Sequence, residues 1–363
     1  MQVHVSNQDP RSFAEQVNRV YAELRQDGVP VADMRRAPAM ELQFAGMGDP
    51  GRRENAAPAT YGVEPVEGPI VARQVPAISP AESRLRYFLD GAQRTFAVMR
   101  MGLVPVAATV AAAGVLKREP TGDGMLEPGT LALEHCWLIP GVSEPDLDDL
   151  RKRIDGAGMS IIDPLPKRED GETAQVTDYG QLHELAYAAA QRVRSEVEQR
   201  ALKAWTGRVE WRADDSWILV DGRLSIAASR AVGLVKQFTE SYLSGEDAIT
   251  MLSLPPGYRT TAFSPPLRRH YGEDSGERTM WYIRLWDADG MDARHSLVRV
   301  EAHAELVTTE QIDEISSWIL AERTPRATGD ARWATLLYPV HLLERMLKRR
   351  LDADTRGWPG AGA

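Results

Sequence analysis

The stretch RLRYFLDGAQRTFAV at residues 84–98 decides the fold, because an apolar β-type run in it ends in Asp90-Gly91. The same pattern returns far along the chain in SWILVDGRLSIAAS at residues 216–229, where the run ends in Asp221-Gly222. In each stretch the glycine permits a sharp turn directly after a carboxylate at the end of a buried strand. One such acid is ordinary. Two predict that distant strands meet to hold a divalent metal ion.

The order of the remaining elements predicts the fold class. Tight turns at Asp90-Gly91 and Gly102 separate β-type runs at 85–90, 94–101 and 104–115, which indicates an antiparallel meander. Further strands are expected at 131–139, 217–221, 279–286 and 296–302, and helices at 12–27, 144–157, 178–205, 308–322 and 336–351. This order is typical of an α/β, ribonuclease H-like fold, a mixed sheet flanked by helices. In that fold, carboxylates of the first strand, first helix and fourth strand converge on one sheet edge.

Composition narrows the class of protein. The chain has 363 residues, a net charge of −9 and one cysteine, Cys136, which excludes an internal disulfide framework and a multi-cysteine zinc site. No apolar stretch approaches the length of a membrane span, and we expect a cytoplasmic protein. The acidic balance argues against a nucleic-acid coat protein and is compatible with a nuclease. We predict a helical and extended arm over 1–80, a main domain over 81–352 and a flexible tail over 353–363.

Carboxylates of this kind hold two hard cations, so Mn²⁺ or Mg²⁺ is the expected metal. Asp90 and Asp221 are the first two candidate ligands. The third comes from the helix at 178–205, whose apolar stripe includes Val193. Glu196 borders that stripe, whereas Glu198 points about 140° away from Val193 at 100° per residue. Glu196 is therefore the first candidate and Glu198 the second.

Five segments carry a resemblance to a known family. They are, in chain order, FLDGAQRTF at 88–96, ILVDGRL at 218–224, VGLVKQ at 232–237, LVRVEA at 297–302 and LLYPVHLLERML at 336–347. At these residues the chain resembles the NurA nucleases, which work with the hexameric ATPase HerA. The resemblance implies a ribonuclease H-like fold, manganese-dependent DNA cleavage, a homodimer, and docking onto a HerA-type hexameric ATPase. DNA end processing and antiphage defence are both compatible with it.

The match departs from the family near the C-terminus. The family carries a tyrosine-proline pair, matched here by Tyr338-Pro339, and a metal-facing histidine about one turn later. Glu344 stands in that register, and His341 lies one turn earlier on the same face. Either residue is a candidate to complete the metal shell, and Tyr338 is a candidate to position the scissile phosphate. An inactive scaffold subunit that caps the ATPase is the alternative function.

Three basic residues are candidates for contacts with DNA. Lys236 ends an apolar run, Arg94 lies four residues after Asp90, and Arg223 follows the second Asp-Gly pair. Glu301, between Val300 and Ala302, is a candidate acid behind the metal ligands. Because the chain is acidic, we expect the ATPase to deliver single- or double-stranded DNA to it.

Overall fold

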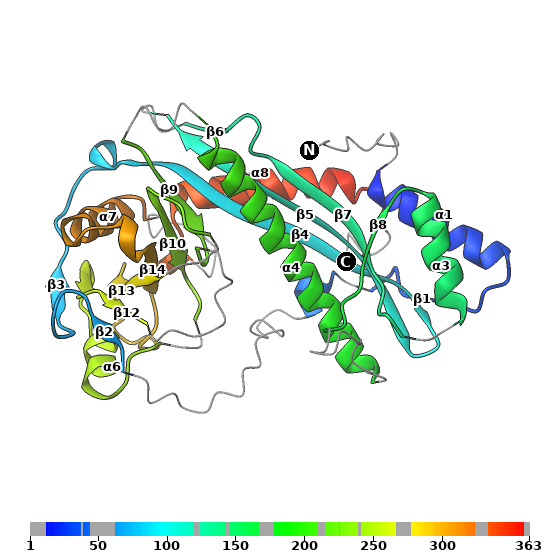
Figure 1. The fold of residues 1–363 in the computed structure, drawn as a ribbon, viewed down its shortest axis with the longest axis horizontal. Coiled ribbons are helices and arrows are strands. Elements are labelled where there is room, and N and C mark those ends of the chain that lie inside the picture. The colour runs from blue at the N-terminus through cyan, green and yellow to red at the C-terminus, as the bar shows by residue number, and fades with distance from the viewer. Residues whose placement is uncertain are drawn as a thin grey trace.

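In a computed structural model, the chain is described over residues 12–37, 39–43, 62–119, 123–142, 145–166, 178–208, 215–224, 226–238, 241–265, 277–323 and 333–358. Within these ranges the fold is mixed α/β, with a large mixed sheet of 14 strands and helices packed against it (Figure 1). The strands are β1 (Ala32–Asp33), β2 (Glu64–Pro65), β3 (Ala72–Gln74), β4 (Leu85–Met101), β5 (Val104–Arg118), β6 (Gly124–Leu126), β7 (Ala132–Leu138), β8 (Ser160–Ile162), β9 (Trp217–Asp221), β10 (Ala231–Val235), β11 (Tyr258–Thr260), β12 (Phe263–Ser264), β13 (Arg278–Arg284) and β14 (Leu297–His303). The helices are α1 (Phe13–Gln26), α2 (Met40–Gln43), α3 (Pro145–Gly156), α4 (Tyr179–Thr206), α6 (Gly245–Leu252), α7 (Thr309–Ala321) and α8 (Tyr338–Asp354), with short 3₁₀ turns η2 (Pro80–Glu82), η4 (Ala304–Leu306) and η5 (Trp333–Thr335).

The centre of the sheet has the order β7-β5-β4-β9-β10. β4, β5 and β7 are successively antiparallel, whereas β4 and β9, and β9 and β10, are parallel. β14 and β13 extend the sheet beyond β10 in antiparallel pairing. Because a parallel connection needs a long crossover, α4 lies between the meander and β9 in the chain. This order places the two Asp-Gly strands side by side.

The two faces of the sheet are covered by different helices. Phe88 of β4 belongs to the hydrophobic cluster that includes residues of α1, α3, α7 and α8. Its neighbour Leu89 belongs to a second cluster, formed with α4. Successive side chains of a strand point to opposite faces, so β4 is buried on both sides. Figure 1 shows α4 crossing β4 and β5 on one face.

The predicted turn at Asp90-Gly91 is wrong. β4 runs without interruption through both residues, and Asp90 is paired with Gly114 of β5. The sequence suggested a turn because Asp-Gly is a common turn pair. Gly91 has a different role here: its missing side chain makes room for a side chain of α4, as described below. The turn expected at Gly102 is confirmed, with a φ of 55°.

Most other predicted elements are confirmed, with ends that differ by a few residues. The strands at 217–221 and 131–139 correspond to β9 and β7, and the helix at 178–205 corresponds to α4. Its N-cap is Asp178, whose side chain accepts the Gln181 N–H at 2.8 Å. Thr308 caps α7, and its side chain accepts the Gln311 N–H at 3.4 Å.

The described parts of residues 1–80 pack on the main sheet. α1 joins the larger hydrophobic cluster, β1 pairs with β4, and β2 and β3 pair with β12 and β11. Buried Glu67 receives two hydrogen bonds from the Arg259 guanidinium, at 2.6 and 2.9 Å, which ties the segment before β3 to β11. Residues 1–11, 38 and 44–61 lie outside the description.

The beginning of the predicted flexible tail is ordered, which corrects that prediction for residues 353–358. α8 continues to Asp354, and Trp358 is 4% exposed and stacks on Phe96 with ring centroids 4.6 Å apart. The Gly- and Pro-rich composition suggested disorder, but one buried indole outweighs it. Residues 359–363 lie outside the description. Within the described ranges, no helix has the length and apolar character needed to cross a membrane.

Candidate functional site

Asp90 and Asp221 lie on neighbouring parallel strands, each one residue beyond the last registered pair, Leu89 with Val220. Adjacent strands are about 4.8 Å apart, so the two carboxylates start from neighbouring positions. Asp90 is 8% exposed and its Oδ1 accepts the Gly91 N–H at 2.7 Å. Burial raises the pKa of Asp90 well above its ordinary value, the charge of Asp221 raises it further, and Lys236 opposes the rise. The sequence expectation that these two strands meet is confirmed.

Glu198 is the carboxylate of α4 that lies against β4 beside Asp90, over Gly91. A Cβ on Gly91 would lie 2.7 Å from the Glu198 Cγ and still closer to its carboxylate oxygen, which is nearer than real Cβ contacts allow. Burial raises the pKa of Glu198 to about 7; Arg194 lowers it and the charge of Asp221 raises it. Glu198 therefore lies in the same electrostatic environment as the two aspartates.

Glu196, the first candidate from the sequence, does not face this cluster, because it is exposed on α4. The prediction centred the sheet-facing stripe on Val193. The structure widens that stripe on one side, where the helix also buries Ala190, Ala201, Leu202 and Trp205. At about 100° per residue these positions turn the packed face toward Glu198 and away from Glu196.

Two of the three acids pair with cations. Lys236 Nζ lies 2.8 Å from Asp221 Oδ2, and Arg194 Nε lies 3.4 Å from Glu198 Oε1. Lys236 reaches Asp221 because β10 runs parallel to β9, with Leu234 in register with Asp221. As the side chains stand, no three His, Cys, Asp or Glu groups of the described ranges are spaced to hold a metal ion. The acids instead pair with these two cations.

The turn after Asp221 depends on two glycines. Gly222 has a φ of 120°, which side chains rarely adopt. A Cβ on Gly233 of β10 would lie 2.7 Å from the Gly222 carbonyl oxygen and 2.8 Å from the Leu224 nitrogen. The chain therefore folds back tightly over β10 directly after Asp221, and this turn fixes the backbone position from which the Asp221 side chain extends.

The α8 candidates make contacts along their own helix. Glu344 Oε1 lies 2.6 Å from Lys348 Nζ, and Glu344 Oε2 lies 3.9 Å from His341 Nδ1. Tyr338, at the first position of α8, is 54% exposed. The charged groups that shift the pKa of Asp90 are not on α8: they are Asp221 of β9, Lys236 at the end of β10, and Glu198 and Arg194 of α4.

The other basic candidates are placed differently from Lys236. Arg94 Nη2 lies 3.2 Å from Asp352 Oδ1 of α8, and it stands four residues, or about 13 Å, along β4 from Asp90. Arg223 is half-buried in the turn after Gly222. Glu301 is fully buried, pairs with Arg299 at 2.7 Å, and stands opposite Gly233 in the ladder between β10 and β14.

Sequence reasoning missed Arg194 and the role of Gly91. A signal for Arg194 was present, because it precedes Glu198 by four residues and such pairs are neighbours on a helix. No local signal reveals that Gly91 lies beneath α4. Comparison with protein-family models gives no match for this chain, and comparison with curated proteins gives none either.

Proposed function

We propose that this chain is a metal-dependent DNA nuclease with a ribonuclease H-like core, of the type that the NurA resemblance implies. The observation that carries the proposal is that Asp90 of β4, Glu198 of α4 and Asp221 of β9 are close enough for the charges of Asp221 and Glu198 to raise the pKa of Asp90. The order β7-β5-β4-β9-β10, with its antiparallel and parallel pairs, supports the same fold assignment. Two-metal sites of this class need carboxylates held close together.

The residues fit hard divalent cations such as Mn²⁺ or Mg²⁺. All three groups offer oxygen ligands, and these metals prefer oxygen. Burial is the main cause of the raised pKa values of Asp90 and Glu198, because it disfavours their charged forms. A divalent cation bound beside them would favour those charged forms. Gly91 provides a cradle in which the Glu198 carboxylate reaches the strand. Asp90, Asp221 and Glu198 would hold the ions, with His341 or Glu344 as the candidate fourth group.

The chemistry is hydrolysis of a phosphodiester. When bound, divalent ions lower the pKa of a coordinated water and stabilise the leaving oxygen. The chain itself keeps the acids in place through the strand register and the Gly222 turn. Lys236, now paired with Asp221, would contact a phosphate oxygen of the substrate, and Arg194 holds the Glu198 carboxylate. Tyr338, Arg94 and Arg223 remain candidates for contacts farther along the DNA.

The proposal includes a homodimer that acts with a HerA-type hexameric ATPase. The net charge of −9 supports a partner that delivers the DNA. Because affinity for DNA comes largely from positive charges that neutralise phosphates, we expect the chain alone to bind DNA weakly. A scaffold subunit without nuclease activity is the alternative, favoured by Glu344 in the register of the family histidine. Cleavage distinguishes the two functions.

The test is cleavage of end-labelled single- and double-stranded DNA with Mn²⁺, with and without the ATPase. We expect Asp90→Asn and Asp221→Asn to reduce cleavage by at least about a hundredfold, as loss of metal-site groups does. Asp215→Asn is the matched control, because Asp215 is an exposed carboxylate just before the other end of β9. Cleavage retained in Asp221→Asn would refute the site. No cleavage in wild type, with the ATPase complex intact, would favour the scaffold.

A further inference from the structure

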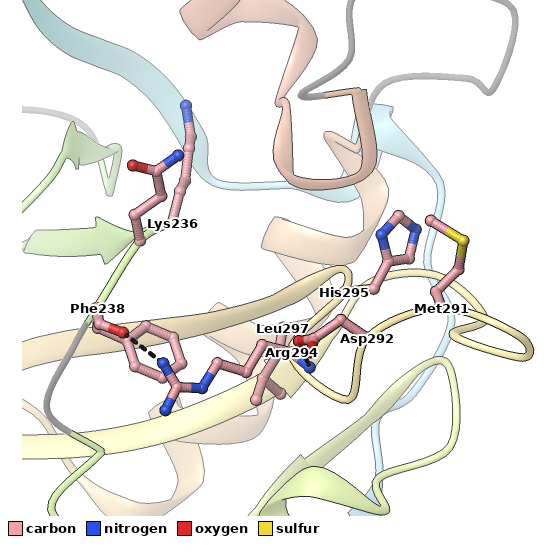
Figure 2. Close-up of a pocket in the computed structure, with 8 residues that line it drawn as sticks. Lys236, Phe238, Met291, Asp292, Arg294, His295 and Leu297 are labelled. Atoms are coloured by element: carbon pink, nitrogen blue, oxygen red, sulfur yellow. Dashed lines mark hydrogen bonds between the residues drawn. The ribbon is translucent and has the colours of Figure 1, made fainter. Parts of the chain in front are cut away.

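A hollow of about 360 Å³ lies beside the carboxylate cluster. It opens between the end of β10 and the loop that joins β13 to β14, and Figure 2 shows Lys236 and Phe238 on one side, with His295 and Met291 on the other. Its volume falls in the range of small-ligand sites, about 300–1,000 Å³. Its lining residues are Lys236, Gln237, Phe238, Met291, Asp292, Arg294, His295 and Leu297.

Lys236 joins this hollow to the candidate active site. Its ammonium group lies 2.8 Å from Asp221 Oδ2, and the same residue lines the hollow. Phe238 follows two residues later, so a single short segment after β10 contributes to both places. A ligand bound to the carboxylate cluster and extending past Lys236 enters the hollow.

The lining combines positive charge with an aromatic surface. The Arg294 guanidinium lies 5.9 Å from the centre of the Phe238 ring, and its Nη1 donates to the Phe238 carbonyl at 3.3 Å. The one carboxylate of the lining, Asp292, accepts the backbone N–H of Arg294 at 2.8 Å, and the two cationic side chains of the lining, Lys236 and Arg294, outnumber it. Phosphate groups favour such cations, and a base favours the ring.

An aromatic row continues from the hollow. The His295 and Trp333 rings have centroids 6.0 Å apart, and the Trp333 and Trp286 rings follow at 5.8 Å. The Arg323 guanidinium lies 4.1 Å from the centre of the Trp286 ring. Aromatic rings with neighbouring guanidinium groups are typical of sites that bind single-stranded nucleic acid.

The loop that carries Arg294 and His295 is held in place by hydrogen bonds from two buried side chains, Arg284 and Ser296. Buried Arg284 donates to the carbonyl groups of Leu252 and Ala293, both at 2.8 Å, and also to those of Leu254 and His295. Ser296 Oγ donates to the Trp286 carbonyl at 2.5 Å. A loop fixed in this way loses little conformational entropy when a ligand binds, which favours binding.

We infer that the hollow binds one nucleotide of a single-stranded polynucleotide, with its phosphate against Lys236 and Arg294 and its base against Phe238. The inference deepens the proposed nuclease and rests on it for the identity of the ligand. A single strand is the occupant because a base can enter a hollow of this size only when it is unpaired and unstacked. The hollow then positions the nucleotide next to the one whose phosphate lies at Asp90 and Asp221.

The experiment measures binding without cleavage. Fluorescence anisotropy follows a labelled oligodeoxythymidylate in EDTA over a series of salt concentrations. Arg294→Ala removes an exposed phosphate contact, so affinity falls about tenfold and the slope of log K against log salt falls by about 0.7. Phe238→Leu lowers affinity about tenfold with the slope unchanged, because stacking releases no counterions. A 5-iododeoxyuridine strand crosslinks to Phe238.

Arg25→Ala is the matched control, since Arg25 is exposed on α1 at the opposite end of the molecule (Figure 1). The inference would be overturned if Arg294→Ala kept wild-type affinity, or if its affinity fell only as much as that of Arg25→Ala. It would also be overturned if wild type did not bind the strand. Cleavage with Mn²⁺ separates it from the proposed function. If the variants lose affinity but wild type does not cleave DNA, the binding site in the hollow is supported and the proposed nuclease activity is refuted. If cleavage depends on Asp90 but Arg294→Ala binds the strand as wild type does, the nuclease is supported and the binding site in the hollow is refuted.

Discussion

The Glu198 carboxylate of α4 packs directly over Gly91 of β4, in the space that any other residue would fill with its Cβ. This contact brings an acid of the helix to the strand that carries Asp90. It also explains why the Asp-Gly pair lies in the middle of a strand. The glycine is needed for a close approach between two elements and not for a turn.

Gly91→Ala is therefore expected to displace Glu198 and to reduce DNA cleavage by at least about tenfold. A Cβ there would lie within 2.9 Å of the Glu198 carboxyl carbon. Gly114→Ala on β5 is the matched control, because Gly114 is paired with Asp90 but its Cβ would meet the ends of the flexible Leu126 and Leu131 side chains. Equal cleavage by the two variants, with both folded by circular dichroism, would contradict the assigned role of Gly91.

Glu198 and Glu196 differ in position and should differ in effect. Glu198→Gln removes a charge beside Asp221, so cleavage should fall by about a hundredfold and calorimetric Mn²⁺ affinity should weaken. Glu196→Gln removes an exposed charge on the same helix and should leave both unchanged. The reverse pattern would restore Glu196 as the helix ligand.

The raised pKa of Glu198 predicts a pH-dependent stability in the absence of divalent ions. In the folded chain Glu198 holds its proton up to about pH 7, whereas the unfolded chain releases it near the ordinary value of 4.5. The folded state thus binds more protons across this window, and the free energy of unfolding falls as pH rises through it. The stabilisation is complete below pH 4.5 and lost above pH 7, and its upper size is about 3 kcal/mol.

Glu198→Gln does not titrate, so it isolates this contribution. In EDTA, the free energy of unfolding of Glu198→Gln minus that of wild type should increase from about pH 5 to about pH 8, measured by urea titration. Mn²⁺ or Mg²⁺ should stabilise wild type more than the variant at the upper end. A difference that stays constant with pH would show that Glu198 titrates normally.

Trp358 is expected to stabilise the fold although it lies near the C-terminus. Its indole is buried against Phe96, so Trp358→Ala should lower the free energy of unfolding by about 3 kcal/mol. Arg356→Ala is the control, because Arg356 is exposed two residues before Trp358, and it should keep wild-type stability. Chemical denaturation compares the three proteins, and an unchanged midpoint in Trp358→Ala would mean that the stack contributes little.

Much of the architecture could be predicted because it depends on local patterns. The apolar run at 217–221 and the amphipathic helix at 178–205 have periodicities that few other structures satisfy. The expected meeting of Asp90 and Asp221 followed from the strand order of a meander, a helix and a further strand. The short strands β2, β3, β11 and β12 were not predicted, since two or three residues carry too weak a pattern.

The sequence by itself determined the carboxylates of β4 and β9, the strands that bear them, and the long helix between. Only the tertiary structure decided that Gly91 makes room rather than a turn, that Glu198 and not Glu196 packs against Gly91, and that Lys236 pairs with Asp221. The physical reason is that periodicity fixes which side of an element is apolar, but not its rotation against its neighbours. That rotation is set by packing over the whole of α4, where Ala201, Leu202 and Trp205 are buried as firmly as Val193.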